Sequence, residues 1–273
     1  MNSNFISILS DTTIKYLMKE ERTRKIYLEL FSHIIGVDLS NYKIVDNKLN
    51  NGNNRNDYRL DLLLEKGDTL VNIKVNKAME NYTILKNLTY VFPLASSRLE
   101  QGEKNTSKEV IQINLNNDKF ECGDAVLEYE LMNEKYNSVK KGIKIYDVYL
   151  ENYKDICYTG ANEDEMLLSM LTANTDEDLK RIIGNSKKGL VIMNEIEKLK
   201  LNDEFNAWYN AEKVEEKCRN SAYFEGTNNG IIVGEKNKQL EVAKLMLNNN
   251  EDLDKISKYT GLTISELEDL FNN

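Results

Sequence analysis

Residues 61–77, DLLLEKGDTLVNIKVNK, decide the fold of this chain because they predict a β-hairpin. Two apolar runs flank Gly67 and Asp68, and a Gly-Asp pair between such runs is a strong signal for a hairpin turn. Strand side chains alternate between two faces, so one face of the hairpin is predicted to be apolar. That face carries Leu60, Leu62, Leu64, Val71, Ile73 and Val75. We expect these six side chains to form part of a core.

The opposite face of the hairpin is polar. It carries Asp57, Arg59 and Asp61 on the first strand and Asn72, Lys74 and Asn76 on the second. The simplest interpretation is an antiparallel hairpin that packs one face on a core and leaves this polar face solvated. The alternative is that the polar groups gather at a cleft.

The segments around the hairpin predict an α/β fold. A long helical stretch is expected between Asp11, as its N-cap, and Gly36, as its C-terminal stop. Residues 80–99 have helical spacing, with Pro93 as a kink or a helix start. Strands are predicted at residues 42–45, 109–115, 125–132 and 143–150. Together these elements predict a mixed sheet flanked by helices.

After residue 150 the pattern becomes helical and acidic. Residues 1–150 contain 21 Lys/Arg and 21 Asp/Glu, whereas the remainder contains 15 and 24, so the net charge of −9 arises entirely there. Three parts are therefore predicted: an α/β domain at 1–150, an acidic helical region at 151–225, and a connector with a C-terminal helical hairpin at 226–273.

The last part begins with GTNNGIIVG, in which every fourth residue is glycine. Glycine weakens a helix, so a flexible connector is favoured over a helix with one close-packing face. In the hairpin that follows, Asn250 is expected to cap the first helix and Gly261 to end it. Thr263 and Glu266 have the spacing of a capping box.

Composition disfavours several classes of function. The three cysteines, Cys122, Cys157 and Cys218, are far apart and suggest neither a disulfide framework nor a zinc site. His33 is the only histidine, so catalysis by a histidine-containing triad has little material. No apolar window reaches the roughly 18 residues of a membrane helix, and no secretory leader is visible, so a cytoplasmic protein without a membrane contact is expected.

The chain resembles the PD-(D/E)XK nuclease family transposases, also called the recombination-promoting nuclease family. In the first half the resemblance rests on DYRLDLLLE, VNIKVN, YTILKNLTYVFPLASSRLEQGE and EVIQINL. In the second half it rests on EGTNNGIIVGEK, EVAKLML and ISKYTGLTISEL, so that it covers nearly the whole chain.

This resemblance implies a restriction-endonuclease-like fold, Mg²⁺ as cofactor, DNA as partner and a role in DNA recombination. Its members carry an Asp on one strand and a Glu-x-Gln on the next. By position, Asp61 matches the Asp, Lys74 the Glu and Asn76 the Gln. Lys86 and Tyr90 fall where the family usually has Arg and Tyr.

Lys74 is the departure that matters. Mg²⁺ is held by hard carboxylate oxygens, and a lysine in place of an acid puts a cation beside the ion. At a separation of about 4 Å and an effective dielectric constant of about 20, one unit of such repulsion is worth roughly 4 kcal/mol. Our hypothesis is that Lys74 occupies the place of the metal and pairs with Asp61, which leaves a degenerate active site with impaired cleavage.

Two other interpretations stay open. In the first, a displaced acid completes an active metal site, with Glu29, Asp57 or Glu65 as candidates. In the second, the protein is a non-catalytic binding or regulatory protein that uses the acidic helical region for contacts with other proteins. Its partner would be a second copy of the chain or a related family member.

Overall fold

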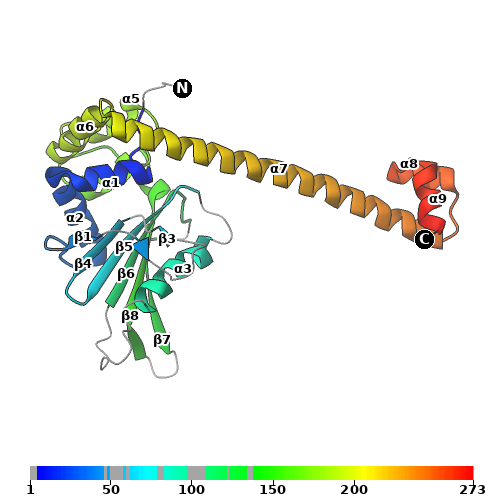
Figure 1. Ribbon diagram of the computed structural model, residues 1–273, viewed down its shortest axis with the longest axis horizontal. Coiled ribbons are helices and arrows are strands. Elements are labelled where there is room, and N and C mark those ends of the chain that lie inside the picture. Colours follow the sequence, from blue (N-terminus) through cyan, green and yellow to red (C-terminus); the bar gives the residue numbers. More distant parts are fainter. Residues whose placement is uncertain are drawn as a thin grey trace. The chain divides into compact units, whose positions relative to one another are not determined.

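The computed structural model describes residues 5–45, 48–49, 58–59, 62–78, 83–96, 109–121, 123–133 and 138–272. It shows an α/β fold in which a mixed six-stranded sheet is flanked by helices and followed by a helical C-terminal region (Figure 1). The predicted fold class is thereby confirmed. None of the helices in these ranges combines the length and the apolar character that a membrane span needs.

The sheet has the strand order β1-β4-β5-β6-β8-β7. Its strands are β1 (Lys43–Val45), β4 (Leu62–Lys66), β5 (Thr69–Asn76), β6 (Glu109–Asn116), β7 (Val126–Asn133) and β8 (Ser138–Tyr149). β5, β6 and β8 run parallel, whereas β1–β4, β4–β5 and β7–β8 pair antiparallel. Two short strands, β2 (Lys48–Leu49) and β3 (Tyr58–Arg59), form a separate antiparallel pair.

The predicted hairpin is formed by β4 and β5. Its register places Leu62 opposite Ile73 and Leu64 opposite Val71. Gly67 has a φ of +56°, a conformation that a tight hairpin turn requires and that glycine adopts without strain. All four of these paired side chains, together with Val75, are buried in one core cluster, as predicted. Leu60 lies outside the described residues.

Two helices stand where one long N-terminal helix was expected. They are α1 (Asp11–Lys19) and α2 (Glu21–Ile35). Glu20 between them is extended, with φ −77° and ψ 131°, and its carboxylate accepts a hydrogen bond from the Thr23 N–H at 2.8 Å. Ser10 rather than Asp11 caps α1, by accepting from the Thr13 N–H. Gly36 ends α2 in the left-handed conformation, as predicted.

The main core continues beyond residue 150. After a 3₁₀ turn at Leu150–Tyr153 come α4 (Glu163–Leu171), α5 (Asp176–Ile183) and α6 (Lys187–Leu199). Buried side chains from each of these helices, for example Leu167, Leu179 and Ile192, belong to one core cluster. The same cluster contains the apolar side chains on the face of the sheet that packs against α2. The compact unit accordingly runs to Tyr209, and a second unit comprises residues 210–273.

The glycine segment 226–234 is not a flexible connector, because it lies inside α7 (Asp203–Asn248). The cap expected at Asn250 is also wrong. Asn250 has a φ of +58° after the end of α7, and Asp252 caps α8 (Leu253–Thr260). Gly261 ends α8 as predicted.

The predicted capping box precedes α9 (Ile264–Asn272). The Thr263 N–H donates to the Glu266 carboxylate at 2.9 Å, and the Glu266 N–H donates to Thr263 Oγ1 at 3.3 Å. Lys236, which donates to the same carboxylate, and the Thr263 N–H hold the pKa of Glu266 down to about 2. The box therefore also connects α9 to α7 within the second unit.

A substitution at Gly189 tests whether α6 packs in the main core. A Cβ at Gly189 would lie 2.8 Å from the Cβ of Ile183 on α5. We expect Gly189→Ala to lower the free energy of unfolding by roughly 1–2 kcal/mol, because overpacking outweighs the gain in helix propensity. Lys187→Ala, an exposed position on the same helix, should change it by less than about 0.5 kcal/mol. Urea denaturation measures both, and a more stable Gly189→Ala protein would contradict this packing.

Candidate functional site

The two faces of the sheet differ in chemistry. The face toward α2 is apolar. The other face is covered by α3 (Thr83–Ser96), a helix that continues through Pro93 (Figure 1). A small apolar cluster lies between α3 and one half of that face, and it contains Leu63, Leu70, Val91, Leu94 and Val110. The other half of the face is polar.

This polar half is buried. We call its seven side chains the polar cluster: Asn72, Lys74 and Asn76 on β5, Gln112, Asn114 and Asn116 on β6, and Asp147 on β8. Each of them is less than 9% exposed. The register aligns Lys74, Asn114 and Asp147 in one row across three parallel strands. The interpretation of Asn72, Lys74 and Asn76 as a solvated face is therefore wrong.

Amide hydrogen bonds connect the polar cluster from strand to strand. Asn72 Nδ2 donates to Gln112 Oε1 at 3.1 Å, and Asn76 Nδ2 donates to Asn116 Oδ1 at 2.8 Å. Gln112 Nε2 donates to Asn114 Oδ1 at 2.8 Å, and Asn114 Nδ2 donates to Asp147 Oδ1 at 2.7 Å. These bonds offset the cost of removing the amides from water.

The network is incomplete at its edges. On this side of the sheet, within the described part of the chain, Asn72 Oδ1 and Asn87 Oδ1 are fully buried and have no hydrogen-bond partner. Each such atom costs about 1–3 kcal/mol of stability. Burial also raises the pKa of Asp147, and the hydrogen bonds from Asn114 and Asn116 only partly oppose this rise. Burial of the polar cluster under α3 therefore lowers the stability of the fold compared with apolar side chains in the same space.

Lys74 is the cation of the polar cluster, and it contacts α3. Its Nζ lies 4.2 Å from the ring centroid of Tyr90, in a cation–π arrangement. Lys74 is only 6% exposed, and Tyr90 is half-buried. The structure therefore brings together three of the residues singled out in the sequence, Lys74, Asn76 and Tyr90. Lys86, one turn before Tyr90 on α3, is exposed.

The other predicted site residues are not at the polar cluster. Asp57 and Asp61 lie outside the described residues. Glu29 lies on α2, which packs against the opposite face of the sheet, and its carboxylate accepts from Lys188 Nζ at 2.9 Å. Glu65 stands opposite Leu70, at the turn end of the hairpin and away from Lys74. Neither Glu29 nor Glu65 is placed to act with Lys74.

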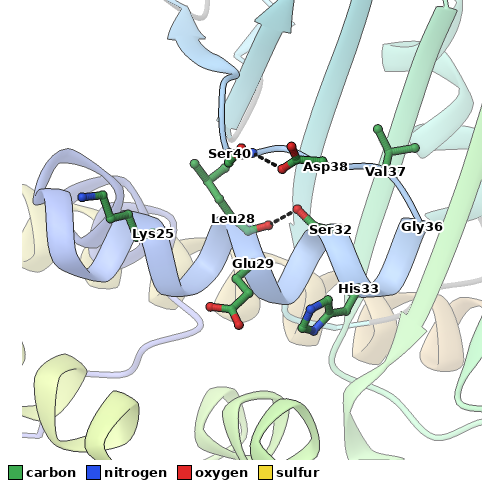
Figure 2. A pocket seen from close by; sticks show the side chains of 9 residues that line it. All are labelled: Lys25, Leu28, Glu29, Ser32, His33, Gly36, Val37, Asp38 and Ser40. Carbon is green, nitrogen blue, oxygen red and sulfur yellow. Dashed lines mark hydrogen bonds between the residues drawn. The ribbon is translucent and has the colours of Figure 1, made fainter.

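A groove of about 580 Å³ lies beside α2, away from the polar cluster. It is lined by Lys25, Leu28, Glu29, Ser32, His33, Gly36, Val37, Asp38 and Ser40 (Figure 2). Two of its polar side chains are used in contacts between helices. Besides the ion pair of Glu29 with Lys188, His33 Nδ1 lies 2.6 Å from Asp164 Oδ2. These contacts attach α2 to α6 and α4.

The described donor atoms of the polar cluster do not fit Mg²⁺. Six of the seven side chains are amides or an ammonium group, and the seventh, Asp147, already accepts from Asn114. Mg²⁺ in proteins is held by carboxylates and water in octahedral geometry. In the described ranges, no group of three or more His, Cys, Asp or Glu side chains is placed to hold a metal ion.

Sequence reasoning missed the β6 and β8 members of the polar cluster. The signal was present in QINLN at 112–116, where Gln112, Asn114 and Asn116 alternate with apolar residues. That alternation repeats the pattern of Asn72, Lys74 and Asn76. Two strands with the same polar period pair their polar faces when they lie side by side, but the sequence does not show that they are neighbours.

Asp147 gives the polar cluster a pH dependence. A carboxyl whose pKa is raised by folding binds its proton more tightly in the folded state. The wild-type free energy of unfolding should therefore fall, relative to that of Asp147→Asn, as the pH rises above the ordinary Asp value of 3.8. The new amide oxygen can still accept from Asn114, so the variant should fold. Urea denaturation over a pH series measures the difference, and parallel curves would disprove the effect of burial.

Comparisons of the chain with protein-family models, with curated proteins and with solved structures found no match. The resemblance to the PD-(D/E)XK nuclease family transposases stays a prediction that rests on the residues named above. What the geometry adds is a buried lysine on the strand where that resemblance expects the second acid. The function must be inferred from this side chain and its neighbours.

Proposed function

We propose that the protein is a transposase-associated, PD-(D/E)XK nuclease-like protein whose own DNA cleavage is impaired. The observation that carries the proposal is the position of Lys74. Its ammonium group lies in the polar cluster, over the Tyr90 ring. Lys74 belongs to β5, which pairs directly with β4, the strand that begins just after Asp61. The fold would be of the restriction-endonuclease-like kind, with its catalytic centre converted into an interior polar network.

The arrangement of the strands supports this proposal. The resemblance needs the Asp and the Glu-x-Gln on adjacent strands, and β4 and β5 are adjacent and antiparallel. It also aligns Asn76 with the Gln and Tyr90 with the Tyr, and both residues lie on the same side of the sheet as Lys74. Pairing of Lys74 with Asp61 remains part of the hypothesis, because Asp61 is not among the described residues.

The chemical argument concerns charge. Hydrolysis of a phosphodiester by a metal-activated water needs anionic ligands, which hold the ion and remain ionised beside it. A buried ammonium group repels a dication, and the surrounding amides are neutral and weak substitutes for a carboxylate. Lys74 therefore disfavours the binding of Mg²⁺ beside it.

A plasmid-cleavage assay with Mg²⁺ or Mn²⁺ tests this proposal. Wild-type protein should show no divalent-dependent nicking. Lys74→Glu should nick at a rate at least roughly tenfold above the background seen without a divalent ion, since lowering the barrier by about 1.4 kcal/mol already gives that factor. Adding Asp61→Ala should remove the gained activity.

Lys66→Glu is the matched control. Lys66 lies on the same hairpin and its Nζ is 5.6 Å from the Tyr42 ring centroid, so the same charge reversal occurs beside a tyrosine but away from the polar cluster. It should gain no activity. Thermal unfolding shows whether each variant is folded. Wild-type nicking that Asp61→Ala abolishes would overturn the proposal, as would a Mn²⁺-soaked wild-type crystal with an ion bound at Asp61.

A second candidate function is binding of other proteins through the acidic helices. It is favoured by the three consecutive acids in the first turn of α4 and of α5.

A measurement of DNA binding separates the two candidate functions. If the α3 side faces DNA, Lys86→Glu should weaken binding of a labelled duplex roughly threefold to tenfold and reduce the salt dependence by about one phosphate contact. Wild-type protein with no salt-dependent affinity for DNA would favour the protein-binding role.

A further inference from the structure

The hydrogen bonds of the polar cluster lead in one direction, toward Asp147. Asn72 donates to Gln112, Gln112 donates to Asn114, and Asn114 donates to the Asp147 carboxylate. Each amide therefore turns its NH₂ group toward Asp147 and its oxygen away from it. We call these four side chains the relay. It crosses the sheet from β5 through β6 to β8.

The ionisation of Asp147 fixes the direction of the relay. An ionised carboxylate can only accept hydrogen bonds, whereas a protonated carboxyl can also donate one. A protonated Asp147 can donate to Asn114 Oδ1 if the Asn114 amide turns over. Asn114 Nδ2 then faces Gln112, so the amides of Gln112 and Asn72 turn over in sequence. One proton can thus reverse every bond of the relay, since bonds in such a chain reinforce one another.

The two directions differ in how the sheet is bonded to α3. In the direction that the structure shows, Gln112 Nε2 also donates to the Asn87 main-chain oxygen of α3 at 3.4 Å. Asn72 Oδ1 has no partner among the described residues in this direction. After reversal, Asn72 Oδ1 accepts from Gln112 Nε2, and Gln112 turns its own oxygen toward the Asn87 oxygen. The sheet then exchanges a bond to α3 for a bond within itself.

We propose that the relay is a proton-operated switch, in which protonation of Asp147 reverses the three amides and releases α3 from the sheet at Asn87. The release acts on the cover of Lys74, because Tyr90 follows Asn87 by one turn of α3 and lies over the Lys74 ammonium group. Val91 and Leu94 stay packed in their apolar cluster, so the effect is confined to the first half of α3. This inference does not rest on the proposed function, because it uses only the relay and the position of α3.

Asp147 is the member of the relay that titrates, and the groups around it keep their charge while it does so. Burial raises the pKa of Asp147, so it takes up its proton at a higher pH than an exposed aspartate. Tyr129 on β7 and Tyr149 on β8 lie close enough for its charge to affect them. Burial raises the pKa of Tyr129, and that of Tyr149 to about 12, so both remain neutral in acid. Lys74 lies in the same row beyond Asn114, under Tyr90.

The other charged side chains of these two strands face away from Asp147. Lys144 forms ion pairs with Glu128 and Glu130, and Glu128 also accepts from the Tyr146 hydroxyl. Tyr146 belongs to the main core on the α2 face of the sheet. Because strand side chains alternate, Lys144 and Tyr146 share that face, whereas Asp147 lies on the α3 face.

Nuclear magnetic resonance of the full chain over a pH series tests the proposal. The Asp147 carboxyl carbon and the side-chain amides of Gln112 and Asn114 should titrate with one common midpoint. Below that midpoint, the protection of the backbone amides at residues 87–91 against hydrogen exchange should fall roughly threefold to tenfold, because a hydrogen bond to α3 is lost. Protection is taken relative to the intrinsic exchange rate at each pH. The amides of α2, on the opposite face, should keep theirs.

Two variants separate the relay from a general effect of acid. Asp147→Asn should remove the pH response of α3. Gln112→Met breaks the relay at its centre with a side chain of similar length, so Asp147 should still titrate while α3 no longer responds. Asn76→Leu is the matched control, because it also replaces a buried amide of the polar cluster but lies outside the relay, on the branch through Asn116. It should keep the response.

Thermal unfolding shows that each variant is folded at the pH of the measurement. Three results would overturn the proposal: protection of α3 that does not change as Asp147 titrates, a response that persists in Gln112→Met, or unfolding of the wild type before Asp147 takes up its proton. The plasmid-cleavage results do not depend on any of these outcomes.

Discussion

Burial of β5 on both faces is the constraint on which the rest of the structure depends. Every residue from Leu70 to Asn76 is buried, although three of the seven are polar. Val71, Ile73 and Val75 face the main core, whereas Asn72, Lys74 and Asn76 face α3. Because an interior strand has no access to water, its polar side chains must find partners on neighbouring elements. β6 supplies amide partners for Asn72 and Asn76, and the carboxylate of Asp147 on β8 accepts in turn from Asn114 on β6.

The parts of the fold that were predictable are those with local signals. The β4–β5 hairpin follows from alternation and from Gly67, and the end of α2 from Gly36. The parts that were missed depend on tertiary contacts. Helical spacing continues through Glu20, and only the extended backbone there shows that α1 and α2 are separate. Likewise, glycine spacing in 226–234 is compatible with a loop or a helix, and the structure has a helix.

The candidate site shows the same division. The alternation of strand side chains predicted that Lys74 and Asn76 share a face, and helical spacing predicted a helix that contains Tyr90. Nothing in the local sequence indicated that this helix, α3, would cover the polar face of the sheet. A row of Asn, Lys and Asn is the composition of a solvated strand face. Only the neighbouring strand with Gln112, Asn114 and Asn116 turns it into an interior network. Whether a polar strand face is solvated or buried as a polar network thus depends on the side chains of the neighbouring strands.

The glycines of α7 have a further consequence for how this helix opens. Helices ordinarily lose backbone hydrogen bonds first at their ends, where four groups are unsatisfied. In α7, however, Phe205 and Tyr209 near one end are buried in the main core, and Ala243 near the other end is buried under α8 and α9. The residues with the lowest helix propensity lie between these anchors. Amide hydrogens around Gly230 should therefore exchange with solvent before those at either end, so that α7 behaves as two cooperative segments joined at its centre.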